Sequence, residues 1–177
     1  DLLLDEAFIK KTSKSLRNIA ICVKKTPVIL GTIRKDNDAL YNTAAVLING
    51  EVVVYRDKTH LPTYDVFDED RYFSSSKSRE PIELLMNGKK IKLGIEICED
   101  LWDEDYKIKV SQELVQKGAE ILINISASPF HINRMEERSS IIRDKVGQLK
   151  CYFIYCNLVG AQDELVFDGQ SCVINPE

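Results

Sequence analysis

The spacing of apolar residues along the first third of the chain predicts one helix followed by strands. Over residues 5–25 apolar side chains recur at helical spacing. Residues 26–33 are mostly apolar and predict a buried strand. Residues 43–48 and 51–57 are rich in β-forming residues and flank Asn49-Gly50, a pair that tolerates the positive φ of a type I′ turn. We therefore predict a hairpin there. The apolar positions of the helix are Phe8, Leu16, Ile19, Ala20 and Val23.

The second half of the chain alternates between strand and helix patterns. Gly118 ends the first of these helices, because glycine readily adopts the left-handed conformation that follows a helix. Asp168-Gly169 is a further turn signal within residues 165–174. This alternation predicts an α/β fold in which helices cover a mixed sheet. The predicted strands are residues 91–97, 120–125 and 151–159, and the predicted helices cover residues 105–117 and 135–149.

Two stretches have no clean period. Residues 58–73 combine proline, aspartate and aromatic residues and predict a long structured loop, a feature that is often functional in compact domains. Residues 126–133 predict a second loop between strand and helix. Because ligand groups gather where the strands of an α/β sheet end, both loops are candidate site segments.

Composition narrows the classes of protein. The chain has 177 residues, 44% of them hydrophobic and 29% charged, which fits one globular domain or a large piece of one. A formal net charge of −4 does not favour a nucleic-acid or membrane surface, and no apolar run approaches the length of a membrane span. The chain begins at Asp1 without a secretory signal pattern, and both of its ends look cut. We therefore expect residues 1–177 to be a fragment of a longer polypeptide.

Cysteine and histidine usage predicts a reduced compartment and no metal centre. The five cysteines are odd in number and lack the spacing of a zinc site, and the two histidines are far apart. We expect a cytoplasmic protein on these grounds. Cys98 differs from the other cysteines because it directly follows a strand pattern, where a sharp turn would expose a nucleophile beside backbone N–H groups. Glu96, Glu99 and Asp100 surround it and would disfavour a thiolate, so a reactive Cys98 needs a cation or a base nearby.

Each candidate also has an ordinary interpretation. Free cysteines are most often buried structural residues, a lysine after a strand is usually a solvated charge, and an acid among acids is usually a surface residue. Taken alone, Cys98, Lys58 and Glu69 would therefore not indicate an enzyme.

Four sequence blocks resemble one family in order along the chain. Residues 58–73 (KTHLPTYDVFDEDRYF) resemble the lysine motif of the nitrilase superfamily, and they are most similar to the glutaminase domain of glutamine-dependent NAD synthetases. Residues 94–102 (GIEICEDLW) resemble the nucleophile motif of that family. Residues 126–131 (SASPFH) and 157–171 (NLVGAQDELVFDGQS) follow its pattern as well. The resemblance implies a nitrilase-like α-β-β-α sandwich, with mixed sheets covered by helices and incomplete in this fragment.

The resemblance implies a role for individual residues. Cys98 corresponds to the nucleophile, Lys58 to the triad lysine and Glu69 to an accessory carboxylate, and we expect the three to converge on one pocket. The triad glutamate, which is the general base, is expected upstream of Asp1, so residues 1–177 alone should be inactive. The residues that the resemblance implies for substrate binding are Tyr64, Glu99 (through its backbone N–H), Ser128 and Arg134.

The implied reaction is the hydrolysis of the side-chain amide of L-glutamine through a thioester, supplying ammonia for ATP-dependent NAD synthesis. This half of the reaction would need no cofactor or metal. ATP and Mg²⁺ are expected only in a C-terminal synthetase domain of the same polypeptide, which residues 1–177 do not include. We expect a homo-oligomer, without nucleic-acid or membrane partners.

Two alternatives stay open at this point. Another nitrilase-superfamily amidase, acting on a different amide or on a nitrile, would share Lys58, Glu69 and Cys98, but it would not be expected to share SASPFH or DELVFDG. A non-catalytic assembly scaffold would give no reason for Lys58 and Cys98 both to be present.

Overall fold

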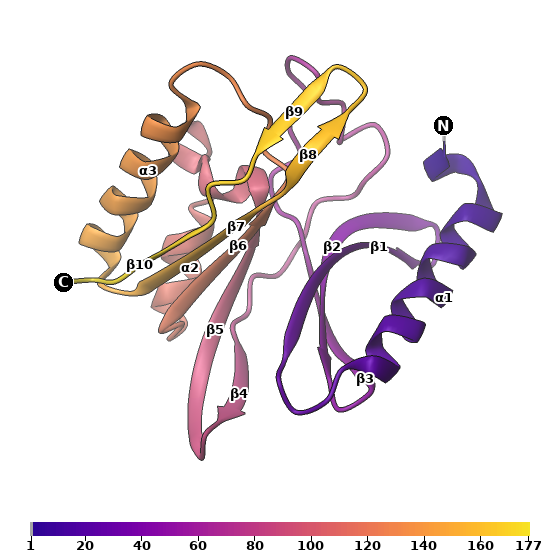
Figure 1. Cartoon of the computed structure of the whole chain (residues 1–177), viewed down its shortest axis with the longest axis horizontal. Helices are drawn as coiled ribbons and strands as arrows, with labels where there is room; N and C mark the ends of the chain where they lie inside the picture. The colour runs from indigo at the N-terminus through magenta and orange to yellow at the C-terminus, as the bar shows by residue number, and fades with distance from the viewer. Residues whose placement is uncertain (1) are drawn as a thin grey trace. The chain divides into compact units, whose positions relative to one another are not determined.

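The computed structural model describes residues 2–177 (Figure 1). The chain forms two units, Asp1–Lys77 and Ser78–Glu177, and each is described by itself below.

The first unit is a three-stranded antiparallel sheet packed against one long helix. Asp5 begins the helix, because its carboxylate accepts a hydrogen bond from the backbone N–H of Ala7 at 2.8 Å. The strands pair in the order β1-β2-β3. Leu16 and Ala20 of the helix pack against Ala45 and Leu47 of the middle strand. The elements are η1 (Leu2–Leu4), α1 (Glu6–Cys22), β1 (Val28–Asp36), β2 (Ala39–Ile48) and β3 (Glu51–Asp57).

The predicted first helix is confirmed, and one of the apolar positions that indicated it is exposed. Ile9, Leu16 and Ala20 form the buried stripe of α1. Ile19 is 44% exposed, because it points about 100° around the helix from Ala20 and away from the sheet.

The predicted hairpin and the predicted strand before it are both confirmed, but that strand is not buried. Asn49 and Gly50 join β2 to β3 with φ values of 53° and 90°, as a type I′ turn requires. β1 runs to Asp36 and none of its residues is fully buried. Among residues 2–177 it pairs with β2 alone, at an edge of the three-stranded sheet, and its apolar residues are partly exposed.

The second unit contains a five-stranded mixed sheet in the order β10-β7-β6-β5-β4. β5, β6 and β7 run parallel, and the strands at the two edges are antiparallel to their neighbours. A separate hairpin, β8-β9, precedes the last strand. The strands are β4 (Ile82–Met86), β5 (Lys89–Ile97), β6 (Ile121–Ser126), β7 (Tyr152–Asn157), β8 (Val159–Gln162), β9 (Leu165–Asp168) and β10 (Cys172–Ile174).

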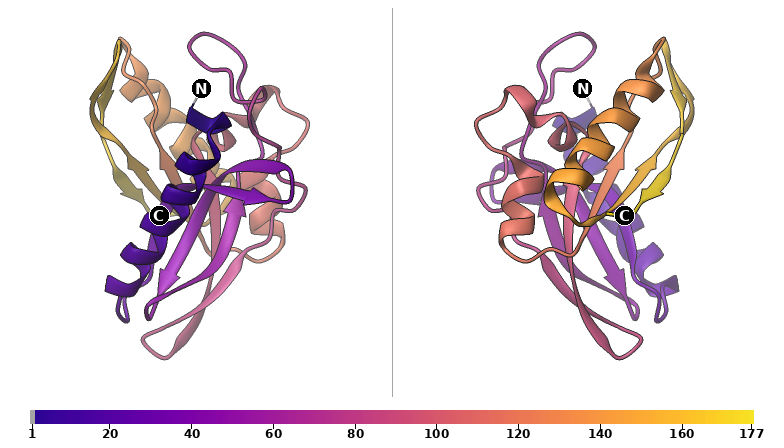
Figure 2. Two further views of the ribbon diagram at one scale, coloured as in Figure 1. Left: turned by 90° about the vertical axis from the view of Figure 1, so that its right-hand side faces the viewer. Right: turned by 90° about the vertical axis from the view of Figure 1, so that its left-hand side faces the viewer.

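Two helices cover one face of this sheet (Figure 2). α2 (Val110–Gln116) and α3 (Arg134–Leu149) pack their apolar stripes onto β6 and β7. The buried cluster between helices and sheet consists of Leu101, Val110, Leu114, Ala119, Leu122, Ile142, Val146, Cys151, Phe153 and Tyr155.

The predicted start of the second helix and the missed strand β4 differ from the structure. α2 begins at Val110, five residues later than predicted, because the Asp103 carboxylate accepts a hydrogen bond from the Val110 N–H at 2.9 Å. Gly118, with φ of 95°, ends the helix region as predicted. β4 was not predicted, although Asn87 and Gly88, with φ values of 50° and 78°, form the same kind of turn as the first hairpin.

Two glycines of the second unit allow a paired test of core packing. A methyl group on Gly94 would lie 2.7 Å from Leu122 Cδ2 and 3.1 Å from Leu114 Cβ, so Gly94→Ala should lower the free energy of unfolding by about 1–3 kcal/mol. Gly147 in α3 has no atom within 4 Å of that position, so Gly147→Ala should stabilise by up to about 1 kcal/mol. Urea unfolding of the chain, followed by the fluorescence of its single tryptophan, Trp102, measures both. An equal response of the two variants would contradict the packing at Gly94.

Candidate active site

Lys58 and Glu69 form a buried ion pair at the end of β3. The Lys58 side chain is 1% exposed, and its ammonium donates to Glu69 Oε1 at 2.5 Å. A buried ammonium without a partner would carry a large desolvation penalty, so this carboxylate is what allows Lys58 to be both buried and charged. The structure therefore brings together two of the three residues for which the sequence predicts a catalytic role.

Asn42 of β2 contacts both members of this pair. Its backbone carbonyl accepts from the Lys58 N–H at 2.8 Å, and its side-chain amide donates to Glu69 Oε2 at 3.2 Å. The Ser76 N–H donates to the Lys58 carbonyl at 2.9 Å, so both the N–H and the carbonyl of Lys58 are held by hydrogen bonds. Sequence reasoning missed Asn42, because a single asparagine within a strand pattern gives no motif.

Tyr64 lies in the same loop, 51% exposed, with its ring in an edge-to-face contact with Phe67 at a centroid distance of 5.8 Å. The predicted long loop is confirmed, since residues 58–81 contain no helix or strand. The predicted role of Tyr64 in binding glutamine stays a prediction.

Cys98 occupies a sharp turn where β5 ends and the short helix η2 (Cys98–Leu101) begins. Its φ of 46° is left-handed, a conformation that costs a residue other than glycine about 1–3 kcal/mol. Two hydrogen bonds hold the turn: the Ile97 N–H donates to Asp100 Oδ2 at 3.1 Å, and the Asn124 amide donates to the Cys98 carbonyl at 3.4 Å. The predicted turn after the strand is confirmed. Whether Cys98 meets Lys58 and Glu69 in one pocket stays a prediction, because Cys98 belongs to the second unit.

The three acids around Cys98 have different environments. Glu99 Oε1 accepts a hydrogen bond from the Tyr106 hydroxyl at 3.1 Å, and Asp100 caps the turn. Glu96 is fully buried, and burial raises the pKa of its carboxyl to about 8. Glu96 is therefore mainly neutral at pH 7, and it opposes a Cys98 thiolate less than the sequence alone suggested.

The remaining predicted substrate contacts also lie in the second unit. Ser128 follows β6 and is 3% exposed. Arg134 is the first residue of α3, and its guanidinium carbon lies 4.5 Å from the centre of the Trp102 ring. Because Trp102 directly follows η2, this stacking holds Arg134 beside the turn that carries Cys98.

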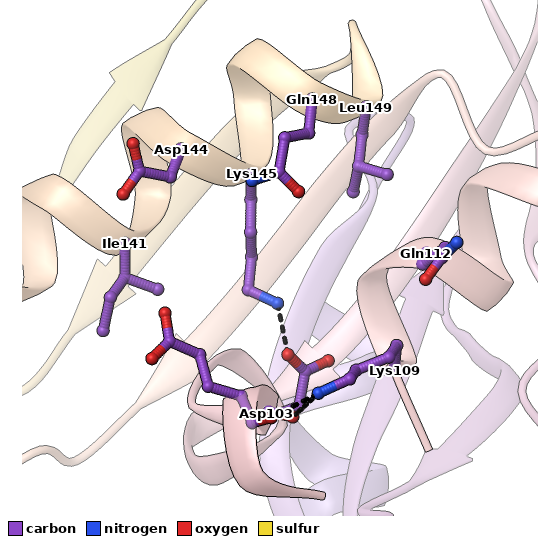
Figure 3. A pocket seen from close by; sticks show the side chains of 9 residues that line it. Asp103, Lys109, Gln112, Ile141, Asp144, Lys145, Gln148 and Leu149 are labelled. Carbon is purple, nitrogen blue, oxygen red and sulfur yellow. Dashed lines mark hydrogen bonds and ion pairs between the residues drawn. The ribbon is translucent and has the colours of Figure 1, made fainter. Parts of the chain in front are cut away.

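A cavity of about 360 Å³ lies between η3 (Asp103–Asp105) and the two helices of the second unit (Figure 3). Figure 3 shows Lys145 reaching across it to Asp103, with an Nζ–Oδ1 distance of 2.6 Å. None of the predicted site residues lines this cavity, so it is separate from the candidate site. Within residues 2–177 no group of three or more His, Cys, Asp or Glu side chains could hold a metal ion, and no helix is long and apolar enough to cross a membrane.

Comparison with known proteins defines the family. The model of the carbon-nitrogen hydrolase family matches residues 7–177. The chain belongs to this family. This chain is 40% identical over 178 residues to the glutamine-dependent NAD(+) synthetase of Aquifex aeolicus. The alignment covers 99% of this chain and 30% of the relative.

Solved structures agree on the fold. The glutamine-dependent NAD⁺ synthetase from Acinetobacter baumannii aligns with a TM-score of 0.88 at 32% identity, over 99% of this chain and 32% of that one. A carbon-nitrogen hydrolase from Helicobacter pylori aligns with a TM-score of 0.78 at 23% identity, over 96% of this chain and 61% of that one, and shows the fold alone. The predicted nitrilase-like class of mixed α/β fold is confirmed by these neighbours. The chain spans about a third or less of the length of the synthetases named here.

The buried Glu96 carboxyl should make stability depend on pH. An unfolded chain loses this proton near pH 4.5, whereas the folded chain keeps it up to about pH 8. Unfolding therefore releases a proton between these values, and stability falls by up to about 1.4 kcal/mol per pH unit as pH rises. Glu96→Gln removes this term, so its stability relative to the unmodified chain should improve steadily from pH 5 to pH 8.

Urea unfolding at several pH values measures this difference. Glu83→Gln is the matched control, because Glu83 is exposed and its pKa is lowered by its hydrogen bond with Lys90, so it should show no such trend above pH 5. Parallel pH profiles for Glu96→Gln and the unmodified chain would show that Glu96 is ionised in the folded state.

Proposed function

We propose that this chain is part of a glutaminase domain that hydrolyses the side-chain amide of L-glutamine and supplies ammonia for ATP-dependent NAD⁺ synthesis. The observation that carries the proposal is the left-handed turn at Cys98, which is pinned by Asp100 and Asn124 at the end of a parallel strand. A strained backbone at the end of a strand is typical of a positioned nucleophile. An ordinary core cysteine would gain nothing from this strain. The similarity to synthetases over 99% of the chain supports the choice of reaction.

In the proposed reaction, Cys98 Sγ attacks the amide carbon of glutamine and forms a tetrahedral adduct. The thiol proton passes to a glutamate base that we place upstream of Asp1, and from there to the departing nitrogen, which leaves as ammonia. Water then attacks the thioester, the C–S bond breaks, and glutamate is released with the thiol restored. No net oxidation occurs, and this half-reaction is proposed to proceed without metal or cofactor.

Lys58 and the Glu99 N–H are proposed to stabilise the oxyanion of the adduct. One such donor typically lowers the barrier by about 3 kcal/mol. The Glu69 carboxylate keeps Lys58 charged despite burial, and Asn42 keeps Glu69 in place. Lys58 is therefore a fixed cation that does not have to be desolvated during the reaction.

The far end of glutamine carries an ammonium and a carboxylate. We propose that Arg134, Ser128 and Tyr64 bind this end, because a site that recognises charged groups needs polar and charged partners. The stacking of Arg134 on Trp102 provides a fixed cation for the carboxylate.

The ammonia acceptor is proposed to be a C-terminal synthetase domain of the same polypeptide. That domain would use ATP and Mg²⁺ to amidate deaminated NAD. A cytoplasmic homo-oligomer is proposed as the setting for both reactions.

Separating the two nitrogen sources tests the proposal. In the complete polypeptide that carries this chain, Cys98→Ala should lower glutamine-dependent NAD⁺ synthesis by at least about 10³-fold, because the nucleophile is removed. Synthesis from free ammonia should continue at the original rate. Cys156→Ala is the control, because Cys156 is also a free and more exposed cysteine. Equal rates from glutamine in Cys98→Ala and Cys156→Ala would rule out the proposed nucleophile.

A further inference from the structure

Asn157 holds the backbone of Ser128 from two sides. The Ser128 N–H donates to Asn157 Oδ1 at 2.9 Å, and the Asn157 side-chain amide donates to the Ser128 carbonyl at 3.4 Å. Both residues are buried. Asn157 is itself fixed, because its own N–H donates to Ser171 Oγ at 3.0 Å. Ser128 therefore has no freedom to turn its backbone toward a ligand.

Arg138 reaches the side chain of Ser128 from α3. It is 2% exposed, and its Nη2 lies 3.5 Å from Ser128 Oγ and 3.4 Å from Asp168 Oδ1. Its Nη1 donates to the Gly169 carbonyl at 3.4 Å. The guanidinium carbon stands 5.2 Å from the centre of the Tyr155 ring, so an aromatic face, a carboxylate and a carbonyl together fix the orientation of Arg138.

These contacts determine which groups of Ser128 donate hydrogen bonds and which accept them. A guanidinium has only donors, so Ser128 Oγ must accept the hydrogen bond from Arg138. The Ser128 N–H and carbonyl are both occupied by Asn157. The group that Ser128 has left for a ligand is its hydroxyl proton. The Tyr155 hydroxyl is the competing acceptor for this proton within the protein, and a carboxylate is the stronger acceptor of the two.

We propose that Arg138 and Asn157 are positioning residues that fix Ser128 as a hydrogen-bond donor, and that this donor selects amides whose far end carries a carboxylate. The inference rests on the proposed glutaminase function and adds to it the residues that set specificity. No sequence motif indicates this role for Arg138, which lies in an ordinary helical pattern.

The test measures ammonia release from two substrates by the complete polypeptide. One is L-glutamine, and the other is 4-aminobutanamide, which keeps the amide and the amine but lacks the carboxylate. Arg138→Lys should lower kcat/KM for glutamine by about 10–100-fold, mainly through KM, because one ammonium cannot reach Ser128, Asp168 and Gly169 together. The loss for 4-aminobutanamide should stay below about 3-fold. Arg143→Lys is the control, because Arg143 is exposed on the same helix.

A double-mutant cycle separates positioning from general stability. In a Ser128→Ala background, Arg138→Lys should cause less than about 3-fold further loss with glutamine, because its target hydroxyl is gone. Asp168→Asn, which weakens the anchor of Arg138 without changing its shape, should give a smaller loss of the same pattern. It replaces Arg138→Lys in the cycle if that variant does not fold.

Two results would overturn the inference: equal losses for both substrates, or losses from Ser128→Ala and Arg138→Lys that multiply. A complete polypeptide that releases no ammonia from glutamine before any substitution would instead overturn the proposed function, so the two failures are distinguishable.

Discussion

A charged side chain can be buried only where another group satisfies it, and this constraint organises the candidate site. Lys58 is as buried as the apolar core, and its ammonium is matched by the Glu69 carboxylate 2.5 Å away. The pair requires the long loop to fold back so that Glu69 faces the end of β3, and it requires Asn42 to occupy the remaining carboxylate oxygen. The fold of residues 58–76 therefore supplies a partner for the buried lysine, and backbone hydrogen bonds such as that from the Glu69 N–H to the Pro62 carbonyl hold the loop in this form.

The second unit places a row of buried polar residues across its sheet. Glu96, Asn124 and Tyr155 are neighbours in the strand register and are all buried. Asn124 links the row to the turn at Cys98, and Arg138 stacks on Tyr155 at its other end. Because burial leaves Glu96 protonated at neutral pH, the row adds little negative charge beneath the cysteine. The core under the strand ends therefore supports the site as well as the fold.

Local patterns were sufficient where one residue pair decides the conformation. Asn49-Gly50 predicted its hairpin, and a cysteine after an apolar strand predicted the turn at Cys98. The start of α2 depends on a cap from Asp103, seven residues earlier, so helical spacing placed it too early. Asn42 contributes through Glu69, 27 residues away, and Arg138 through Ser128 and Asp168, 10 and 30 residues away, so no local pattern identifies either residue. The family motifs identified the residues proposed to meet substrate, while the residues that hold them appeared only in the structure.

The central claim is that Cys98 is a nucleophile directed at a glutamine side chain. Treatment of the complete polypeptide with 6-diazo-5-oxo-L-norleucine, an electrophilic glutamine analogue that loses N₂ when a thiolate attacks it, tests this claim most directly. Peptide mass mapping should find a single adduct on Cys98, and excess glutamine should prevent it. Equal labelling of the exposed Cys22 and Cys156, with no protection by glutamine, would contradict the account.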